Sequence, residues 1–409
     1  MPSNIGLMKK RRVCVIVQSY YLRDPRVRRE AEALADAGYE VDVLTLKDKR
    51  EPWKEVVNGV RIYRMPLSRK RASKARYIFE YAAFLLMAAV VQSVLHVRRR
   101  YDIVHVNNMP NSLVFSAILP KLFGAKVLLD VHDPMAELFI SKYGLSENSL
   151  PIKFLRFDEK LSDSFADHII TVSEVMMDRL VKYGVPAEKI DVVLNVPDTR
   201  IFQPLKLENN SESQNDSFTM LFTGTVAERY GLDCTMRVVA KLQDKCPGLK
   251  LKIVGDGDHI PYLMELRDNL QADFVEFHPP VSITDIPVLA SDCHATIQPQ
   301  LRDCHTDLCF STKVIESFAM GLPVIASATE TMTRYFDDTQ IVFFEPGNEE
   351  DLANAIQRLY FDKELRKSLA AEGLKLSSSL NWELEKPKFL SVIESMLSRK
   401  GVKEGAVVD

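Results

Sequence analysis

Residues 12–46 read RVCVIVQSYYLRDPRVRREAEALADAGYEVDVLTL, and this stretch decides the predicted fold. A short apolar run at 12–17 is followed by an amphipathic segment of helix length and then by a second apolar run at 41–46. Two buried-type strands joined by a helix are typical of a parallel sheet that is covered by helices on both faces. The stretch therefore predicts an α/β fold.

The same alternation continues along both halves of the chain. In the first half it predicts strands at 102–106, 125–133 and 166–173, and helices at 110–123 and 174–183. In the second half it predicts strands at 218–222, 249–257, 273–278, 293–299 and 340–348, with a helix from Gly231. Each half is therefore expected to form a doubly covered parallel sheet.

One polar segment separates the two halves. Residues 207–217 read LENNSESQNDS and cannot bury apolar surface, so they are predicted to be a linker or loop. We therefore predict two α/β domains, at 1–206 and at 218–380. The remaining residues, 381–409, begin with a stretch of helical period and are predicted to form a C-terminal helix and tail.

Composition narrows the classes of function. The chain has 409 residues and a net charge of −3, which gives no reason to expect a nucleic-acid partner. Its six cysteines are too sparse for a disulfide scaffold. Cysteines and histidines at 293–294, 304–305 and 309 are metal-ligand types, but their spacing matches no zinc signature. We expect no metal and no cofactor.

The apolar run near the N-terminus resembles a first strand more than a secretion signal. It follows the basic residues 9–12, is shorter than the roughly 7–15 apolar residues of a signal, and ends at Gln18. We therefore expect a cytoplasmic protein with reduced thiols.

Residues 78–97, IFEYAAFLLMAAVVQSVLHV, form the longest apolar segment. Basic residues flank it on both sides, at Arg69, Lys70, Arg71, Lys74 and Arg76 and again at Arg98, Arg99 and Arg100. One interpretation is a buried crossover helix. The other is a helix that rests on an anionic membrane, where each nearby Lys or Arg adds about 1 kcal/mol. The second interpretation gives a membrane partner through residues 69–100 and a peripheral position at the inner face of the membrane.

Three loops of the second half are candidates for ligand binding, because ligands of open parallel sheets bind beyond the carboxyl ends of the strands. They are FTGTVAERYGLD (222–233), KIVGDGDHI (252–260) and STKVIESFAMGLPVIAS (311–327). Arg229 suits a phosphate, since guanidinium groups bind oxyanions in a bidentate fashion. No GxGxxG follows the first strand of either half, which disfavours a dinucleotide oxidoreductase.

The stretch that begins at Ser311 predicts a short helix with an anion at its start. Ser311 or Thr312 is expected to cap the helix, and the N-terminal amides favour a pyrophosphate. Lys313 and Glu316 lie one turn apart. They form either an ordinary ion pair or a binding pair in which the Glu accepts hydrogen bonds from a ribose diol.

In the first half, Asp130, His132 and Asp133 lie at the end of a predicted strand in LLDVHDP. A strand-end histidine can act as acid, base or neutral donor near pH 7. The arginines at 26, 28 and 29 belong either to a solvated helix start or to a binding rim, and the sequence leaves that choice open.

Taken in order, several segments resemble the retaining glycosyltransferases of family 4, which have the GT-B fold of two facing Rossmann-like domains. The segments are GYEVDVLTL, DIVHVNN, KVLLDVHD, GTVAERYGLD, KIVGDGDHI, KVIESFAMGLPVIAS and FEPGNEEDLANAI. The resemblance covers nearly the whole chain. It implies transfer of a sugar from a nucleotide-sugar to an acceptor, often in polysaccharide or glycolipid assembly, usually without a metal.

The resemblance also implies roles for individual residues. Glu316 resembles the second acid of the family's E-x7-E motif, which holds the ribose, and Arg229 resembles a basic residue on the donor pyrophosphate. Ser311 and Thr312 match the amides that meet the phosphate, and His132 resembles the histidine near the sugar. The predicted donor side comprises Gly224, Arg229, Gly255, Asp256, Ser311, Thr312, Lys313 and Glu316. The predicted catalytic residues are His132, Arg229 and Lys313, and the predicted acceptor-side residues are Asp133 and Arg26.

The chain departs from the family pattern at several positions. The first acid of E-x7-E falls at Leu308, with Asp307 adjacent but out of register. Thr225 and Tyr230 replace the usual Arg and Lys of the first loop. Lys313 matches the K-x-x-E form of the motif, in which the first acid is also absent.

A further departure lies after the first strand, where SYYLRD stands in place of a Gly-rich loop. We therefore predict an NDP-sugar glycosyltransferase with a glycan, lipid-linked or other acceptor. Two alternatives stay open: an inactive GT-B-like binding subunit of an assembly complex, and a sugar-nucleotide epimerase.

Overall fold

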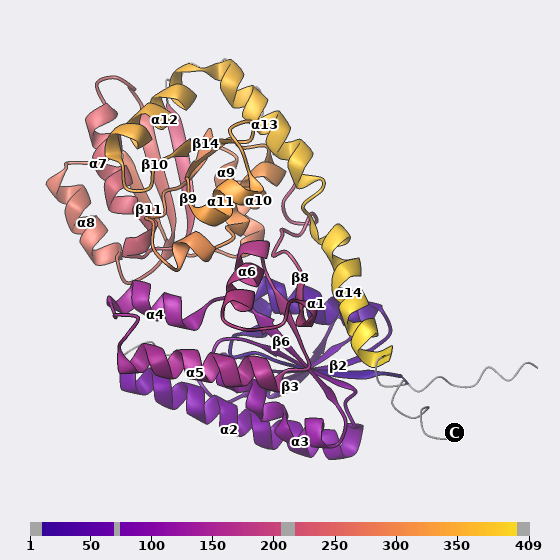
Figure 1. Cartoon of the computed structure of the whole chain (residues 1–409). Coiled ribbons are helices and arrows are strands. Elements are labelled where there is room, and N and C mark those ends of the chain that lie inside the picture. Colours follow the sequence, from indigo (N-terminus) through magenta and orange to yellow (C-terminus); the bar gives the residue numbers. More distant parts are fainter. Residues whose placement is uncertain (1–9, 69–73, 206–216, 399–409) are drawn as a thin grey trace, which may run out of the picture. The chain divides into compact units, whose positions relative to one another are not determined.

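The computed structural model describes residues 10–68, 74–205 and 217–398 (Figure 1). The chain forms two compact units. The first contains the residues up to Leu194 together with those from Lys386 onward, and the second runs from Asn195 to Glu385. The predicted linker at 207–217 lies outside the described residues except for Ser217, so that boundary stays a prediction.

The described residues of the first unit form an eight-stranded sheet in the order β3-β4-β2-β1-β5-β6-β7-β8. All neighbouring strands are parallel except β3 and β4, which form an antiparallel hairpin. The strands are β1 (Arg12–Ile16), β2 (Glu40–Leu46), β3 (Lys54–Val57), β4 (Val60–Met65), β5 (Ile103–Asn107), β6 (Lys126–Val131), β7 (His168–Thr171) and β8 (Ile190–Val192).

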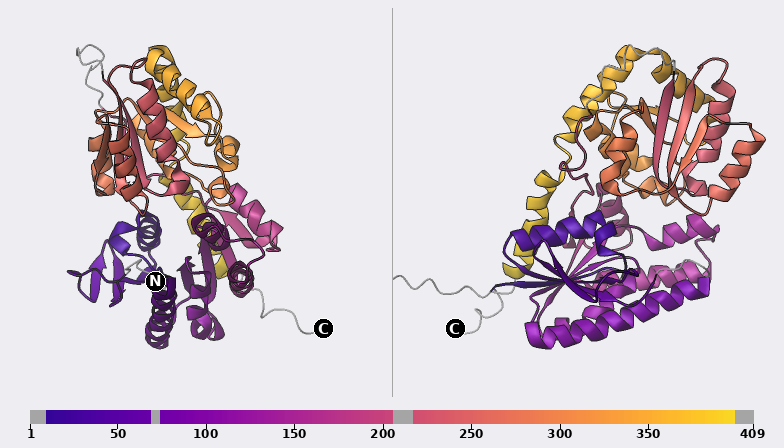
Figure 2. Two further views of the ribbon diagram at one scale, coloured as in Figure 1. Left: turned by 90° about the vertical axis from the view of Figure 1, so that its left-hand side faces the viewer. Right: turned by 180° about the vertical axis from the view of Figure 1, so that it is seen from behind.

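Helices lie on both sides of this sheet (Figures 1 and 2). They are η1 (Tyr21–Arg23), α1 (Pro25–Asp36), α2 (Lys74–Arg99), η2 (Asn111–Ala117), α3 (Ile118–Leu122), α4 (Met135–Tyr143), α5 (Leu150–Phe165), α6 (Glu174–Lys182) and η3 (Ala187–Lys189). The last helix, α14 (Trp382–Ser398), joins the first unit from Lys386.

The helix predicted at 110–123 is wrong in its details. The segment folds as the 3₁₀ helix η2 followed by the short α3. Pro120 has no N–H to donate to the carbonyl four residues earlier, so a continuous α-helix through this position loses a hydrogen bond. With the α-helix starting at Ile118, the proline falls in the first turn, where that loss does not matter.

Helix α2 connects β4 to β5 and therefore is a crossover helix, as one interpretation of the sequence held. Only one side of it is buried, however, through residues such as Phe84 and Ala88. The flanking basic residues Arg69, Lys70 and Arg71 lie outside the described residues, as does the side chain of Lys74.

The described residues of the second unit form a six-stranded, fully parallel sheet in the order β11-β10-β9-β12-β13-β14. The strands are β9 (Phe218–Thr225), β10 (Leu249–Asp256), β11 (Val275–His278), β12 (Ala295–Gln298), β13 (Val324–Ser327) and β14 (Ile341–Phe344). Two sequence predictions are corrected here. Strand β9 continues past Phe222 to Thr225, because its pairing with β10 extends that far, and Cys293 precedes β12 instead of lying in it.

The helices of the second unit also cover both sides of its sheet (Figures 1 and 2). They are η4 (Glu228–Tyr230), α7 (Leu232–Leu242), α8 (Ile260–Asn269), η5 (Ile283–Asp285), α9 (Ile286–Ala290), η6 (Thr306–Leu308), α10 (Thr312–Met320), α11 (Glu330–Tyr335), α12 (Glu349–Phe361) and α13 (Lys363–Ser377).

The strand order of each sheet changes direction next to its first strand. In the first unit β1 lies between β2 and β5, and in the second unit β9 lies between β10 and β12. The loops that leave the two strands at such a point turn to opposite faces of the sheet and leave a crevice for a ligand. A ligand is therefore expected at the carboxyl ends of β1, β5 and β6 in the first unit and of β9, β10 and β12 in the second.

Candidate active site

In the second unit, the loops after β9 and β10 are packed backbone against backbone. Gly224 pairs with Gly255, and the N–H of Val226 donates to the carbonyl of Asp256 at 2.9 Å. A Cβ at Gly255 would lie 1.8 Å from the carbonyl oxygen of Gly224, and a Cβ at Gly257 would lie 1.8 Å from that of Val226. Glycine is therefore required by this close approach, and the two predicted loops form one surface.

The start of α10 reaches the same surface through Lys313. A Cβ built on Gly224 would lie 3.9 Å from Cε of Lys313, so the lysine lies over the glycine. The ammonium is 3.0 Å from the Thr312 hydroxyl and 3.9 Å from Oε1 of Glu316. The expected ion pair with Glu316 is thus present but long. Since the lysine side chain is 38% exposed, its charge is available to an anion.

The expected cap of α10 is wrong in its mechanism. Ser311 is the N-cap residue, but its side chain makes no capping hydrogen bond. The N–H of Val314 instead donates to the Ser311 carbonyl at 3.2 Å, and the Thr312 hydroxyl is held by Lys313. Within the described residues no partner is found for the N–H groups of Thr312 and Lys313, and such groups favour an anion.

Arg229 lies on η4, between β9 and α7. Its Nε is buried and has no hydrogen-bond partner among the described residues, and Cζ lies 5.1 Å from the centre of the Tyr230 ring. Two contacts fix the loop around it. The N–H of Leu301 donates to the Arg229 carbonyl at 2.8 Å, and Gly231, with φ of 60°, packs directly against Pro299. The backbone is therefore held while the guanidinium remains free to bind an oxyanion.

Two other residues of the predicted donor side, and the acid next to Leu308, can now be described. Glu316 is buried on α10, and Asp256 is exposed with its Oδ1 accepting from the Gly257 N–H at 2.8 Å. Asp307, adjacent to the missing first acid at Leu308, accepts from the Glu330 N–H at 3.0 Å and thereby joins η6 to α11. The Asp307 carboxylate therefore has a structural contact of its own.

In the first unit, His132 follows β6 and is buried. Its Nε2 lies 3.1 Å from Oδ2 of Asp130 and 3.0 Å from Oδ1 of Asn107, and its N–H donates to Oδ1 of Asn108 at 2.9 Å. Its Nδ1 is buried and has no partner among the described residues. Burial opposes protonation of His132, but the carboxylate of Asp130 outweighs it and raises the pKa of His132. In the imidazolium form, Nδ1–H is a donor for a ligand oxygen.

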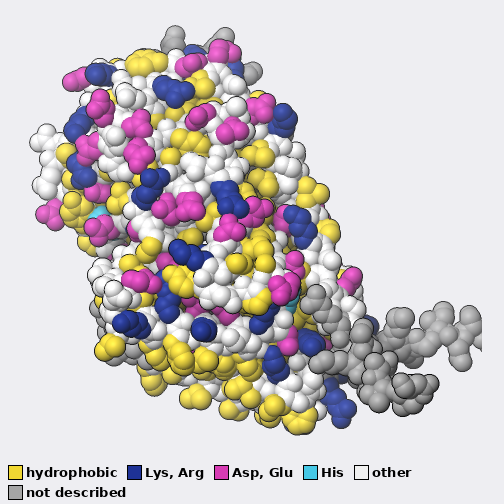
Figure 3. Space-filling view, viewed as in Figure 1, with side chains coloured by type: hydrophobic (Ala, Val, Ile, Leu, Met, Phe, Trp, Pro, Cys, Tyr) yellow, Lys and Arg dark blue, Asp and Glu magenta, His cyan; other side chains and the backbone are white. Residues whose placement is uncertain are grey.

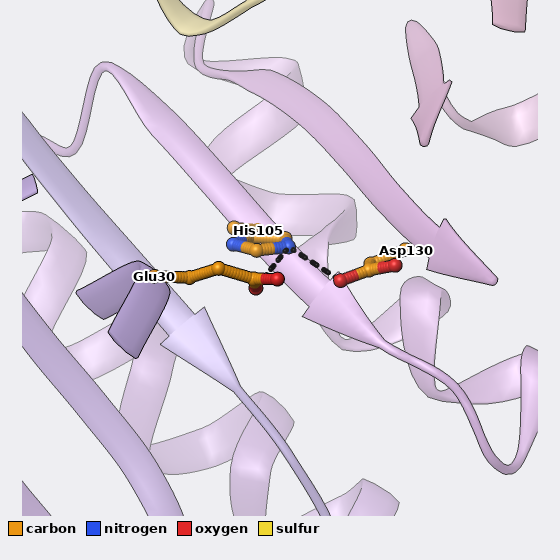
Figure 4. Close-up of side chains that lie close together, drawn as sticks. All are labelled: Glu30, His105 and Asp130. Atoms are coloured by element: carbon orange, nitrogen blue, oxygen red, sulfur yellow. Dashed lines mark ion pairs between the residues drawn. The ribbon is translucent and has the colours of Figure 1, made fainter. Parts of the chain in front are cut away.

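A second buried histidine, His105, lies between two acids, Glu30 and Asp130 (Figure 4). His105 Nε2 is 3.4 Å from Oδ2 of Asp130 and 3.9 Å from Oε2 of Glu30. Burial and the Asp130 charge raise the pKa of Glu30 to about 7. Burial alone would also raise the pKa of Asp130, but the charges and hydrogen bonds of the two histidines hold it below its usual range. We call Glu30, His105, Asp130 and His132 the strand-end cluster.

Ligand atoms of Glu30, His105 and Asp130 all lie within 4.8 Å of one another, close enough to hold a metal ion. Oδ2 of Asp130 is already paired with both His105 and His132. Oε2 of Glu30, both ring nitrogens of His105 and Oδ2 of Asp130 are nevertheless buried without a hydrogen bond of ordinary geometry to any described residue. The cluster is therefore a group of buried ionisable side chains in close contact, and the expectation of no metal stays a prediction.

The arginines after β1 have different surroundings. Arg28 forms a helix-surface pair with Glu32 at 2.8 Å, whereas Arg29 is buried. Nε of Arg26 lies 3.3 Å from Asp24. Burial alone would lower the pKa of Arg26, but the charges of Asp24 and Asp133 outweigh it and raise that pKa. Arg26 and Asp133, both predicted on the acceptor side, therefore influence each other electrostatically near His132.

Sequence reasoning missed Glu30, His105, Asn107 and Asn108. Glu30 looks like any charged residue of a helix, and the two asparagines look like turn residues. A histidine inside the otherwise apolar run IVHV was the available signal, because a buried histidine needs a polar partner.

Comparison with known proteins agrees with this geometry. Residues 24–195 match the family model of the glycosyl transferase 4-like domain, and residues 205–376 match that of the glycosyl transferases group 1. A D-inositol 3-phosphate glycosyltransferase of Thermobifida fusca is 23% identical over 373 residues, which cover 86% of this chain and 83% of that protein.

Solved structures are similar over almost the whole chain. Sucrose-phosphate synthase from Thermosynechococcus elongatus superposes with a TM-score of 0.79 at 20% identity, covering 95% of this chain and 100% of that one. HepE of Anabaena, in complex with UDP-glucose, superposes with a TM-score of 0.69 at 14% identity, covering 94% and 99%.

Two parallel-sheet α/β units of this kind define a GT-B glycosyltransferase fold. With both of its halves matched by glycosyltransferase models, the chain belongs to the family 4-like glycosyltransferases and is an enzyme of that class.

Proposed function

We propose that the protein transfers a sugar from a nucleoside diphosphate sugar to a glycan or lipid-linked acceptor, with retention of configuration. The observation that carries the proposal is the arrangement of Arg229, Lys313 and the free amides of α10 on the loops that follow β9 and β12. All three are donors to an anion, and all belong to the edge where an open parallel sheet binds its ligand.

In the proposed mechanism these donors stabilise the departing diphosphate. Negative charge builds on the β-phosphate as the bond between the sugar and the diphosphate breaks. Preorganised hydrogen-bond donors and cations that face this charge lower the barrier. Removal of one such donor typically slows catalysis by about 10²- to 10³-fold. Because Arg229 and Lys313 supply two fixed positive charges, we also propose that transfer needs no metal ion.

The other residues have supporting roles in the proposal. Buried Glu316 would accept hydrogen bonds from the ribose hydroxyls, the role that acids take in other nucleotide sites. His132 would donate through Nδ1–H to a sugar or acceptor oxygen, with Asp133 and Arg26 on the acceptor side. The family resemblance supports retention.

A similar structure supports the proposed class of donor, since the ligand bound to HepE is UDP-glucose. The name of the Thermobifida fusca relative contains D-inositol 3-phosphate, which is neither a glycan nor a lipid-linked acceptor. For this chain we propose the class of donor, an NDP-sugar, and leave base and sugar to experiment. The matches to glycosyltransferases disfavour both alternatives, an inactive binding subunit and a sugar-nucleotide epimerase.

The test is thermal unfolding of the purified protein with UDP, GDP and ADP. A ligand at 100 times its Kd stabilises the folded state by about 2.7 kcal/mol, so one nucleotide should raise the unfolding temperature clearly above the others. Replacement of Glu316 by Ala should abolish that shift. As a control, Glu364→Ala changes an exposed acid of α13 and should keep it. If no nucleotide stabilises the protein, or if Glu316→Ala responds like the wild type, the proposed donor site is wrong.

A further inference from the structure

Helices α2, α3 and α5 of the first unit carry exposed apolar side chains on one common side (Figures 1 and 3). Both α2 and α5 pack against η2, and α3 continues from η2 and packs against α2. Of the 23 large hydrophobic side chains exposed in the described residues, 11 belong to these three helices, and Phe123 directly follows α3. Figure 3 shows them gathered along the edge of the molecule formed by the three helices. We call this surface the apolar face.

On α2 the exposed residues form a single line. Phe79, Leu86, Val90, Val94 and Val97 are each between 51% and 72% exposed. Their spacings of seven, four, four and three residues keep them on one side of a helix. The opposite side is buried in the core, so α2 is apolar toward both the protein and the solvent. A surface helix of a globular protein ordinarily has polar residues on its solvent side.

Helix α5 repeats this pattern, and α3 adds to it. Leu150, Phe154, Phe157 and Leu161 are exposed on α5 at spacings of four, three and four residues. On α3, Leu122 is 78% exposed, and the adjacent Phe123 and Ile118 are exposed as well. Exposed hydrophobic side chains on a soluble protein are normally scattered singly. A contiguous apolar surface of this kind therefore marks an interaction site.

The charges on these helices are distributed unequally between surface and interior. Among the side chains of the three helices that the structure describes, the exposed charged ones are all basic: Arg76 and Arg98 on α2, and Lys153 and Lys160 on α5. The acids point inward or are partly covered. Glu80 is buried beside Arg76, and Glu159 is buried with Arg179 at 2.5 Å. The partner of this surface is therefore both apolar and anionic.

We propose that the apolar face docks on an anionic lipid bilayer, with its phenylalanine, leucine and valine side chains at the headgroup–acyl boundary and its four bases on anionic headgroups. Burial of apolar area together with attraction of bases to anionic lipid is how interfacial helices bind membranes. The docking itself is independent of catalysis. The consequence that the acceptor is lipid-linked rests on the proposed transferase function.

Two other arrangements fit the surface less well. Helix α2 contains a 21-residue segment, Phe79–Arg99, that is long and apolar enough to cross a membrane. If α2 crossed the membrane, Phe84 and Ala88 would have to leave the hydrophobic core of the first unit. In the proposal α2 therefore lies along the bilayer surface. A second copy of the chain would bring bases against bases with no exposed acid of these helices between them, which is unfavourable.

The experiment is sedimentation of the full chain with vesicles of phosphatidylcholine alone and with phosphatidylserine added. The wild type should sediment with the anionic vesicles, and Phe154→Gln/Phe157→Gln should abolish this. Lys153→Gln/Lys160→Gln should weaken binding about thirtyfold, since each base near an anionic surface contributes roughly a fivefold factor. Matched controls in the second unit are Phe361→Gln and Lys245→Gln, which change equally exposed residues and should bind like the wild type.

Three outcomes would overturn the docking proposal: wild type that stays in the supernatant, apolar-face variants that sediment like wild type, or a dimer that these variants dissociate while no vesicle binding is seen. The nucleotide-dependent thermal shift should be unchanged in every variant. If the wild type does not bind vesicles but shows the nucleotide-dependent shift, the docking proposal is wrong and the transferase proposal stands. If the wild type binds vesicles but shows no such shift, the proposed donor site is wrong and the docking proposal stands.

Discussion

The two units carry their predicted site residues on similar sheet edges that are built in opposite ways. In the first unit the strand-end cluster consists of buried ionisable side chains that compensate one another. In the second unit the edge consists of glycines and backbone amides with two cations, Arg229 and Lys313, that have little or no compensation. The first edge places opposite charges side by side in the interior and leaves Nδ1 of His132 without a partner among the described residues, whereas the second presents two cations and backbone amides without a close carboxylate. The comparison predicts that mutations in the first edge affect stability and those in the second affect ligand binding.

The largest effect on stability is expected for Asp130→Asn. Removing one partner of a buried charge network typically destabilises a protein by about 3–5 kcal/mol, because the other charges stay buried. The pKa of His132 should fall, since Asp130 raises it. Urea unfolding, monitored through hydrogen exchange of the β5 and β6 amides, measures the loss of stability. NMR titration of His132 measures the change in its pKa.

Asp191→Asn is the matched control for that substitution. It also removes an acid paired with a histidine, His168 at 2.7 Å, but the Asp191 side chain is 55% exposed. Exposed pairs contribute about 0–1 kcal/mol, so this variant should unfold almost like the wild type. Equal losses in the two variants would contradict the proposed role of burial.

The second prediction concerns the cations of the second unit. Arg229→Met and Lys313→Met should each lower kcat by about 10²- to 10³-fold, the usual effect of losing one donor to a developing charge. Their unfolding temperatures without nucleotide should be close to that of the wild type, because neither side chain has a strong ionic partner. Rate measurements with the identified donor, together with calorimetry, separate the two effects. Arg267→Met, on α8, changes a partly exposed arginine that pairs with Asp268, and this control should keep full activity.

The third prediction tests the close backbone contact at the same edge. Gly255→Ala places a methyl group 1.8 Å from the Gly224 carbonyl, and overpacking of this kind costs about 1–3 kcal/mol. The loops must separate, so nucleotide affinity should fall as well. Gly257→Ala should behave in the same way. Gly38→Ala, in the first unit, has room for the methyl group but is strained by its φ of 90°, so it should lower stability and leave nucleotide affinity unchanged. Unaltered nucleotide affinity in Gly255→Ala would separate these loops from the donor site.

The fourth prediction concerns the pH dependence of stability. The pKa of Glu30 is about 7, above that of an ordinary Glu, so the folded state binds a proton that the unfolded state releases. This contribution to stability is fully present below about pH 4.3, the value for an unfolded Glu, and is lost as the pH rises through 7. Relative to Glu30→Gln, the wild type should therefore become less stable between pH 5 and pH 8. Parallel stability curves for the two proteins over that range would exclude an ionising Glu30.

Much of the fold could be predicted from the sequence, because the buried strands are visible as short apolar runs. Runs such as RVCVIV and KIVGD alternate with amphipathic segments, and that alternation fixes a doubly covered parallel sheet. The ordered series of loops likewise led to GTVAERYG and STKVIE as a donor edge. What could not be predicted depends on contacts between distant residues. Glu30 and His105 are 75 residues apart and come together only in the folded protein, so no local sequence pattern in either segment predicts the contact.

The apolar face illustrates the same limit. The apolar segment at 78–97 was visible in the sequence, but α5 was not predicted, and its Phe154 and Phe157 give the face its second half. Their spacing is that of an ordinary amphipathic helix, and only the fold determines that they face solvent. The cap at Ser311 failed for a related reason, since residue type allows a cap while backbone geometry decides whether one forms.

The strand order has a consequence for how the protein folds. Val13 of β1 pairs with Ile103 of β5, and Met220 of β9 pairs with Ala295 of β12. Such pairs close long loops, and contacts between distant segments form slowly because chain entropy is lost before they are made. Each ligand edge should therefore be completed late in refolding, after hairpins such as β3–β4. Recovery of nucleotide binding would then time the end of the folding reaction rather than its beginning.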